Sequence, residues 1–563
     1  MSTTMRKSEE PNGVEANDED MPQVETLGTV RLRHVTTNEL LLVPKPSDDP
    51  DDPLNCASTD IFFSYGPLRE KYYIFAFSCL SIAVCNACGA GPSVGAVAMA
   101  TSFFAPPSDP NFVNYISKVA YFFTGAALTI GIGQFIWTPV AIKYGRRPVY
   151  IICFTLLTVC NIWAACAKSY GSMLAARLLT GIAAGAPELV APLTLTDVFF
   201  LHQRGRVMAI YNCALALGSS LAVVILGIVI NWTSWQVVFW ILTGLSAICL
   251  LLMIFTVPET AYNRSIATVV DPVPIPITVL EKSDKSFEHV SRVPPPSPSA
   301  CGRTSRTPYF KRFALIPKVY TGESIWLIMF RPVVLLALPG VLWATLINSV
   351  TVGMIIVLSS NFSTAFQNIY GFTVLQAGLT FISMAIGSLI AIVFAGHFSD
   401  WVADKLTQRN GGVRIPEMRL PALFVGVITG PLGGILYGAG FGLKLHWMCP
   451  VVGIGLIGFT VVQSMNVSLV YILDSYRPVS GEVIVTQSTF KACFGFLLGF
   501  YTNPWVAKDG YLGAFGAMGG IEGAILLGFI PFYYFGSHWR SASWKWGFIK
   551  RLAHWAEDRE VGE

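Results

Sequence analysis

Four ionisable residues lie inside long apolar stretches of this 563-residue sequence, in which only 13% of the residues are Asp, Glu, Lys or Arg. They are Arg177, Glu188, Lys491 and Glu522. A charge at the centre of a lipid bilayer costs several kcal/mol, so a charged side chain found there is a functional candidate. A buried carboxylate can also take up and release a proton. We therefore predict Glu188 as the group that couples protons or contacts a substrate.

Each of these residues also has a purely structural interpretation. Glu188 can pair with Lys491 and hold two helices together. Backbone carbonyls and water at a helix junction can satisfy Arg177, and Glu522 can pack or snorkel at the periphery. No histidine lies in the middle of an apolar stretch, so proton coupling here would need a carboxylate.

Twelve apolar runs, each about 20 residues and long enough to cross a bilayer, must position these side chains. A soluble domain carries about 25% charged residues, almost twice the fraction found here. We predict an all-α membrane protein of two six-helix bundles, 71–258 and 331–535, with polar segments at 1–70, 259–330 and 536–563. The runs lie near 72–99, 118–140, 148–167, 171–197, 207–230, 235–257, 332–358, 372–395, 420–441, 447–472, 483–502 and 511–535.

The basic residues outside the runs orient the protein, because cytosolic loops are enriched in Lys and Arg. With both termini in the cytosol, nearly all of the 38 Lys and Arg residues fall on that side. The opposite side holds only Lys118, Lys168, Lys444 and Lys508. Two Asn-x-Ser/Thr sequons, at Asn231 and Asn361, fall on this outer side and are candidate glycosylation sites. Short sequons also arise by chance.

The two bundles repeat each other chemically. The fourth run ends at Asp197 and the tenth at Asp474, and a basic residue follows each. A short charged loop follows the second run at 143–147, and another follows the eighth at 396–400. Parallel six-helix repeats of this kind build one large class of transporters, whose substrate site lies between the halves.

These loops resemble those of the major facilitator superfamily, and the resemblance covers nearly all of residues 70–540. Residues 138–147 keep the final Gly-Arg-Arg of the family's Gly-x-x-x-Asp-Arg-x-Gly-Arg-Arg pattern but lack its first Gly and its Asp. The family's Arg-x-x-x-Gly is present at 177–181. The chain also resembles a fungal group of drug:proton antiporter-like carriers, near a yeast polyamine and histidinol carrier. This resemblance lies in residues 46–55, 258–264, 409–412 and 503–505.

The resemblance implies a major facilitator fold of twelve transmembrane helices in two pseudo-symmetric bundles that transport by alternating access. It places Arg177 at a position associated with proton coupling. It also implies a cavity lined by the first helix of each three-helix unit. The polar candidates there are Asn86, Asn348, Gln463, Asn466 and Tyr471. Each amide among them can instead make an interhelical hydrogen bond.

The charged loops form a candidate cytosolic gate. Arg146 or Arg147 can pair with Asp197 or Glu259, and Lys405 can pair with Asp474. Such pairs can form in one conformation and break in the other, although any one of these cations can also serve topology alone. The full set is Lys143, Gly145, Arg146, Arg147, Asp197, Glu259, Gly396, Asp400, Lys405 and Asp474.

We predict a secondary transporter in the plasma membrane that exports a secondary metabolite or drug-like compound against protons. Uptake of organic cations such as polyamines, with Glu188 as the cation's partner, is the alternative, and a signalling receptor built on a transporter is a third. Residues 217–223 lack the Gly-Pro motif of antiporters, which weighs against antiport. No nucleotide loop, nucleophile elbow or metal cluster is found, so we expect no enzyme activity, cofactor, metal or nucleic acid. The expected partners are a small-molecule substrate, protons and the lipid bilayer. We expect the protein to be a monomer.

Overall fold

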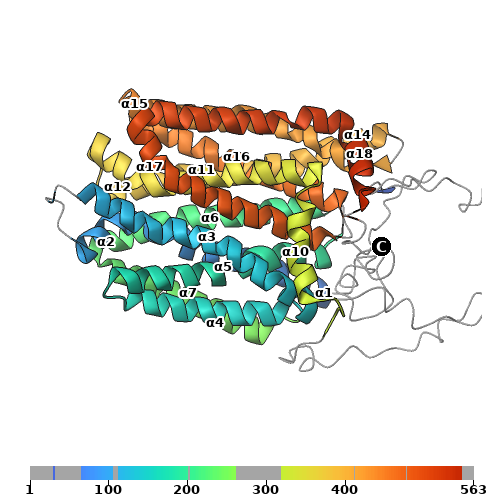
Figure 1. The fold of residues 1–563 in the computed structure, drawn as a ribbon, viewed down its shortest axis with the longest axis horizontal. Coiled ribbons are helices and arrows are strands. Elements are labelled where there is room, and N and C mark those ends of the chain that lie inside the picture. The colour runs from blue at the N-terminus through green and yellow to red at the C-terminus, as the bar shows by residue number, and fades with distance from the viewer. Residues whose placement is uncertain are drawn as a thin grey trace, which may run out of the picture.

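The structure is a computed structural model in which most of the chain between residues 65 and 549 is described. Most of the predicted N-terminal tail, with its family-like stretch at 46–55, and most of the central loop lie outside the described residues. Figure 1 shows helices packed side by side along one long axis. The described residues are 30–31, 65–104, 109, 112–200, 203–261, 319–410, 413–476, 479–547 and 549.

The first half of the molecule consists of α1 to α7, which provide six membrane-spanning segments. Pro92 interrupts the first segment because proline has no N–H to donate, and a short 3-10 helix, η3, separates α1 from α2. The bounds are α1 Tyr65–Ala90, η3 Gly91–Gly95, α2 Ala96–Phe103, α3 Phe112–Tyr144, α4 Arg146–Ala165, α5 Tyr170–Val198, α6 Arg204–Trp232 and α7 Trp235–Thr256.

The second half consists of α10 to α18. A π-helix, η4, joins α13 to α14, and a 3-10 helix, η5, leads into α15. The two-residue strands β1 (Val30–Arg31) and β2 (Val413–Arg414) pair antiparallel. The bounds are α10 Ile325–Leu335, α11 Pro339–Tyr370, α12 Val374–Leu379, α13 Phe381–Ile392, η4 Val393–Phe398, α14 Ser399–Arg409, η5 Pro416–Leu423, α15 Phe424–Gly442, α16 Met448–Ser475, α17 Ser480–Leu527 and α18 Phe529–Trp544.

Twelve spans emerge from the described residues once one long helical segment is divided. Eleven segments are long and apolar enough to cross a membrane, and the last, Gly481–Ser543, has 63 residues. At 1.5 Å per residue it would be about three bilayers long. Gly510, with φ 72° and ψ 172°, breaks the helix and turns the chain back. The prediction of an all-helical membrane fold is confirmed.

The start of the seventh span differs from its prediction. The apolar run near 332–358 combines the end of α10 with most of α11, and the spanning helix itself begins at Pro339. Proline is favoured at the first position of a helix because the N–H that it lacks has no partner there. Hydropathy alone does not detect this boundary.

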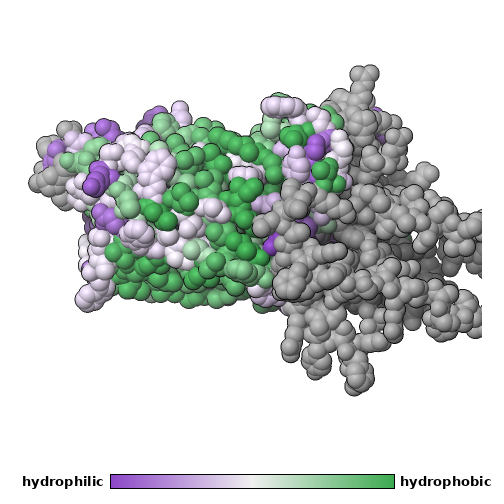
Figure 2. Space-filling model, turned by 90° about the horizontal axis from the view of Figure 1, so that it is seen from below, coloured by the Kyte–Doolittle hydropathy of each residue, from purple (hydrophilic) through white to green (hydrophobic). Residues whose placement is uncertain are grey.

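Apolar side chains cover the outside of the bundle, as a lipid environment requires. Ile152, Ile248 and Leu389 each expose about half of their surface. Figure 2 shows an apolar belt along the middle of one face and polar residues at one end.

The halves pack together mainly through α3 against α17 and α6 against α13 and α16. Figure 1 shows the first half in blue to green and the second in yellow to red, lying along each other. We call the end of the bundle where α4 and α6 begin and α14 ends, at Arg146, Arg204 and Arg409, the basic end.

Candidate functional site

Glu188 and Lys491 form an ion pair that joins the two halves at mid-bundle. Glu188 lies on α5 and Lys491 on α17, and Lys491 Nζ donates to Glu188 Oε1. Gln134 of α3 donates from Nε2 to the other carboxylate oxygen, Oε2, at 3.1 Å. The two side chains expose only 11% and 6% of their surface. The pairing that the sequence offered as a structural interpretation is therefore present.

A small cavity lies beside this pair. Its volume is about 20 Å³, and a cavity needs roughly 10–15 Å³ to hold one water molecule. Helices of both halves contribute to its wall, so a larger substrate needs the halves to separate. The lining residues are Glu188, Pro192, Tyr211, Asn212, Leu215, Asn348, Met465, Leu469, Ile484, Gln487, Ser488 and Lys491.

Arg177 lies away from the pair and is satisfied by backbone. Its Nη1 and Nη2 donate to the carbonyls of Cys88 and Gly89 at 2.7 Å each, and its Nε donates to that of Phe122 at 3.2 Å. Eleven residues separate it from Glu188 along α5, a rise of about 16 Å. The guanidinium therefore ties α5 to α1 and α3 within the first half, at the place where α1 gives way to η3.

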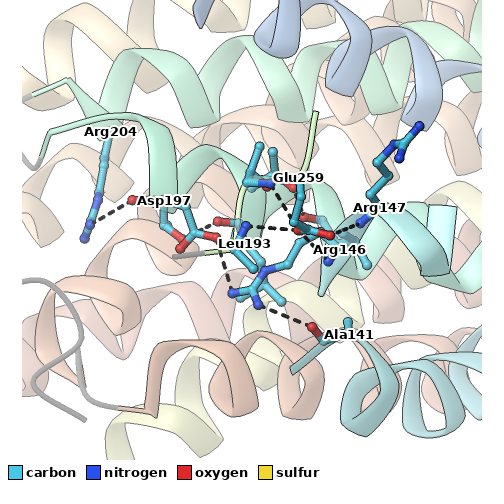
Figure 3. Close-up of polar contacts among 12 residues, drawn as sticks. Ala141, Arg146, Arg147, Leu193, Asp197, Arg204 and Glu259 are labelled. Atoms are coloured by element: carbon cyan, nitrogen blue, oxygen red, sulfur yellow. Dashed lines mark hydrogen bonds and ion pairs between the residues drawn. The ribbon is translucent and has the colours of Figure 1, made fainter. Parts of the chain in front are cut away.

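At the basic end the first half forms a polar cluster (Figure 3). Glu259 accepts hydrogen bonds from the backbone N–H groups of Arg146 at 2.9 Å and Arg147 at 3.1 Å, so its carboxylate caps the start of α4. Arg146 Nη2 lies 3.3 Å from Asp197 Oδ2. Gly145 has φ 97°, and a Cβ there would meet the Glu259 carboxylate at 2.5 Å, so only glycine fits.

The second half carries the opposite charge in its corresponding loop. Asp400 Oδ1 lies 3.0 Å from Arg419 Nη2, and Asp400 Oδ2 lies 3.9 Å from Arg206 Nε of the first half. Gly396 packs against α6, where a Cβ would lie 3.3 Å from that of Ala209. The Asp400–Arg206 contact therefore crosses between the halves, whereas the contacts of Glu259 with the N–H groups of Arg146 and Arg147 lie within the first half.

The predicted pair between Lys405 and Asp474 is not formed in this conformation. Lys405 Nζ instead lies 4.9 Å from the centroid of the Trp401 ring. Burial lowers the pKa of Arg414, and so does nearby Arg419, whereas Asp474 opposes this fall. Asp474 is therefore close enough to Arg414 to favour its charged form.

The comparisons with known proteins can be read against this geometry. The model of the Major Facilitator Superfamily matches residues 74–500. The chain belongs to the Major Facilitator Superfamily. Its family and its transporter-named relatives indicate a multi-pass secondary transporter rather than an enzyme.

Superfamily members from fungi are similar over most of their length. Protein HOL1 of Saccharomyces cerevisiae is 25% identical over 577 residues, covering 91% of this chain and 92% of that protein. An uncharacterised MFS-type transporter of Schizosaccharomyces pombe is 23% identical, covering 84% and 83%. The MFS transporter cpaT of Aspergillus oryzae is 25% identical, covering 73% and 77%.

Two solved structures share the superfamily fold at low sequence identity. The proton:xylose symporter XylE matches with a TM-score of 0.55 at 14% identity, covering 83% of this chain and 96% of that one. The human organic anion transporter MFSD10 matches with a TM-score of 0.51 at 15% identity, covering 82% and 100%.

Of the five polar residues that the superfamily resemblance places at the cavity, Asn348 lines it. Asn86 donates to the carbonyl of Ile82, Gln463 to that of Ala422, and Asn466 to those of Ala395 and Gly205. Tyr471 stacks edge-on against Trp343, 6.1 Å between ring centroids. These four do not line the cavity. Gln463 and Asn466 make hydrogen bonds to other helices, as named for their alternative, whereas Asn86 bonds within its own helix, α1.

Five further polar residues around the pair were not predicted from the sequence, namely Gln134, Tyr211, Asn212, Gln487 and Ser488. Gln487 lies one helical turn before Lys491, and an i, i+4 search from each buried charge would have found it. The Tyr211 hydroxyl donates to the backbone carbonyl of Glu188 at 3.1 Å. No comparable spacing links Gln134 to Glu188.

The basic end also holds buried charges that the sequence did not single out. Arg331 of α10 pairs with Glu482 at 3.0 Å and with Glu323 at 3.1 Å. Arg540 of α18 pairs with Glu417 of η5 at 2.6 Å. These residues lie at the ends of spans. A cation at such a place is already explained by the enrichment of Lys and Arg in cytosolic loops, so the sequence gives no reason to look for a buried partner.

The segment before α10 reaches the first half. Lys143 Nζ donates to the Glu323 carbonyl at 3.4 Å, and Tyr320 N–H donates to the Lys143 carbonyl at 2.9 Å. Burial, with Glu259 nearby, raises the pKa of Tyr320 to about 12. Lys143 therefore contacts the second half through backbone carbonyl and amide groups.

The remaining candidates have different environments. Glu522 is buried against Gly430 of α15, within the second half, so it does not snorkel. Asn231 is exposed at the end of α6. Asn361 is buried and donates from Nδ2 to Asn503 Oδ1 at 3.0 Å, so of the two sequons only Asn231 is accessible.

Proposed function

We propose that this transporter exports a small, largely apolar organic molecule in exchange for protons, with Glu188 as the proton-binding group. The observation that carries the proposal is the ion pair between Glu188 and Lys491, which joins the two halves beside a closed cavity. Residues 258–264 and 503–505 resemble a fungal group of drug:proton antiporter-like carriers that holds both efflux pumps and cation uptake systems. We place both termini in the cytosol of a plasma-membrane monomer.

Through this ion pair, protonation of Glu188 can control whether the two halves stay together. While Glu188 is ionised, Lys491 is held to it in a site of low dielectric, where separating two opposite charges is costly. A proton on Glu188 removes the ionic attraction and leaves the Lys491 ammonium group beside a neutral carboxyl group. The halves can then move apart on the outer side and release the substrate, and release of the proton to the cytosol restores the pair before the next substrate binds.

The composition of the cavity bears on the substrate. Glu188 is the only carboxylate that lines it among the described residues, and Lys491 already occupies this group. A polyamine carries several ammonium groups, and each needs a partner when it leaves water. Amide and hydroxyl side chains beside Leu215, Met465 and Ile484 suit an apolar molecule with a few polar groups.

Flux measurements in cells that lack their own exporters test this function. Cells preloaded with rhodamine 6G should lose the dye faster when they express the full-length protein, and a proton uncoupler should abolish the difference. Glu188→Gln should remove export, and Glu188→Asp should retain part of it. Proton-driven accumulation of labelled spermidine would instead support uptake of cations and contradict the proposal.

Arg177 is proposed as a positioning residue for the helix junction of the first half. Arg177→Lys keeps the charge but cannot reach three carbonyl groups in fixed directions. We expect a less stable protein whose remaining dye export keeps the proton dependence of the wild type. A change in proton dependence, measured as flux against external pH, would place Arg177 in the coupling mechanism.

A further inference from the structure

A groove lined by aromatic and basic side chains lies on the outside of the second half at the basic end. Helices α14 and α18 form its walls, and Pro421 of η5 lies between them. Figure 1 shows α14 and α18 together at this end of the bundle. Its volume is about 590 Å³, within the roughly 300–1,000 Å³ of small-molecule pockets. It shares no residue with the central cavity.

The charge of the groove is entirely positive in the described part of the chain. Lys405 and Arg409 lie one turn apart on α14, both exposed, and no acidic side chain lines the groove there. Asp400 and Asp404 of the same helix are paired elsewhere, with Arg419 and Arg414. The groove therefore offers two cations to an anionic group.

The rest of the lining is apolar and aromatic. Trp401, Ile530 and Tyr534 are exposed along it, and Phe529 and Tyr533 complete the α18 wall. Trp and Tyr are enriched where a membrane meets water. Ile386, Ile390 and Val393 lie in the helical segment that leads into α14, and they are also exposed. The groove thus lies where the lipid-facing surface of this half ends.

A ligand that suits both features carries an anionic group beside a long apolar chain. Basic pockets between transmembrane helices bind anionic lipid headgroups in this way. We propose that the groove binds one anionic phospholipid of the adjacent leaflet, with its headgroup at Lys405 and Arg409 and an acyl chain along the wall of α18. A free phosphate would leave the aromatic wall without a role.

Native mass spectrometry of the full-length protein in detergent, titrated with phosphatidylserine or phosphatidylcholine, tests this site. Wild type should bind one phosphatidylserine at least tenfold more tightly than phosphatidylcholine. Each basic residue near a membrane surface contributes about 1 kcal/mol, a factor of about five. Lys405→Gln and Arg409→Gln should each weaken binding about fivefold, and together about twenty-fivefold. Lys545→Gln, an exposed cation outside the groove at the same end, should bind as wild type.

A second pair of measurements tests the apolar wall. Ile530→Glu places a carboxylate in the groove and should abolish the preference for phosphatidylserine, whereas soluble glycerophosphoserine should not compete at equal concentration. Equal binding of the two lipids by wild type, or unchanged preference in the single and double cation variants, would overturn the proposal. Competition by glycerophosphoserine would also overturn it, because the headgroup alone would then suffice.

Discussion

The two halves meet through opposite charges at mid-bundle and at the basic end, and the two contacts differ in burial. Glu188 and Lys491 are almost entirely enclosed, whereas Arg206 exposes 62% of its side chain to reach Asp400 at 3.9 Å. An exposed pair contributes at most about 1 kcal/mol, but removal of one partner from a buried pair costs roughly 3–5 kcal/mol. The ion pair therefore stabilises the contact between the halves at mid-bundle, whereas packing must stabilise their contact at the basic end.

The packing at the basic end centres on Gly205 at the start of α6. A Cβ there would meet the Asp400 carboxylate and lie 2.7 Å from Arg419 Nη1. Asn466 of α16 also donates to the Gly205 carbonyl at 3.4 Å. In the proposed mechanism a proton neutralises Glu188 before the halves part at mid-bundle, whereas thermal motion suffices to break the exposed ion pair at the basic end.

The largest effect is expected from breaking the central pair. Glu188→Gln or Lys491→Gln alone leaves the other charge buried, and each should lower the stability by roughly 3–5 kcal/mol. The double variant Glu188→Gln/Lys491→Gln should lose less than either single variant, because no unpaired charge remains. Thermal unfolding of the detergent-purified protein gives the order of the midpoints. Additive losses in the double variant would show that the two charges are not coupled.

A smaller loss is expected at the basic end from Asp400→Asn, which leaves the buried Arg419 without its carboxylate. We expect about 3 kcal/mol, again from thermal unfolding. The matched control is Asp404→Asn on the same helix, where the carboxylate is 56% exposed and lies 3.5 Å from Arg414. The control should change stability by less than about 1 kcal/mol. Similar losses in the two variants would mean that burial does not decide the strength of these pairs.

The sequence predicts the membrane spans and the buried charged residues better than it predicts which residues contact each other. Spans are readable because a bilayer demands about 20 apolar residues, and Glu188 and Lys491 stand out because charges within spans are rare. Their amide partner Gln134 is not readable, since it lies 54 residues away on another helix and uncharged amides are common in packed helices.

The environment of Lys405 shows the second limit of the sequence. Five residues along a helix amount to a rotation of about 140°, so Lys405 cannot share a face with Asp400. Asp400 is buried towards η5 and α6, and Lys405 is exposed beside Trp401. Sequence spacing gives this rotation but not which face of α14 packs inward, because that depends on the position of η5.

A shift in conformation rather than a loss of stability is expected from Gly205→Ala. The added methyl group collides with Asp400 and Arg419 across the halves, and overpacking costs roughly 1–3 kcal/mol. The basic end should open more often, so a Ser488→Cys reporter in the central cavity should react with a maleimide added from that side at least fivefold faster. Gly520→Ala, where a Cβ meets nothing within 4 Å, should leave the rate unchanged. An unchanged rate with Gly205→Ala would remove packing as the force that closes this end.

The smallest effect is expected from Arg206→Gln, which removes the cross-half bridge but leaves the packing at Gly205 in place. A 3.9 Å contact to a largely exposed guanidinium should contribute less than about 1 kcal/mol. The labelling rate of the same reporter should therefore rise by less than about fivefold at low ionic strength. The difference from wild type should vanish in 1 M salt, where the screening length falls to about 3 Å. A larger rise than that caused by Gly205→Ala would reverse the comparison, because charge would then hold the basic end as it holds the centre.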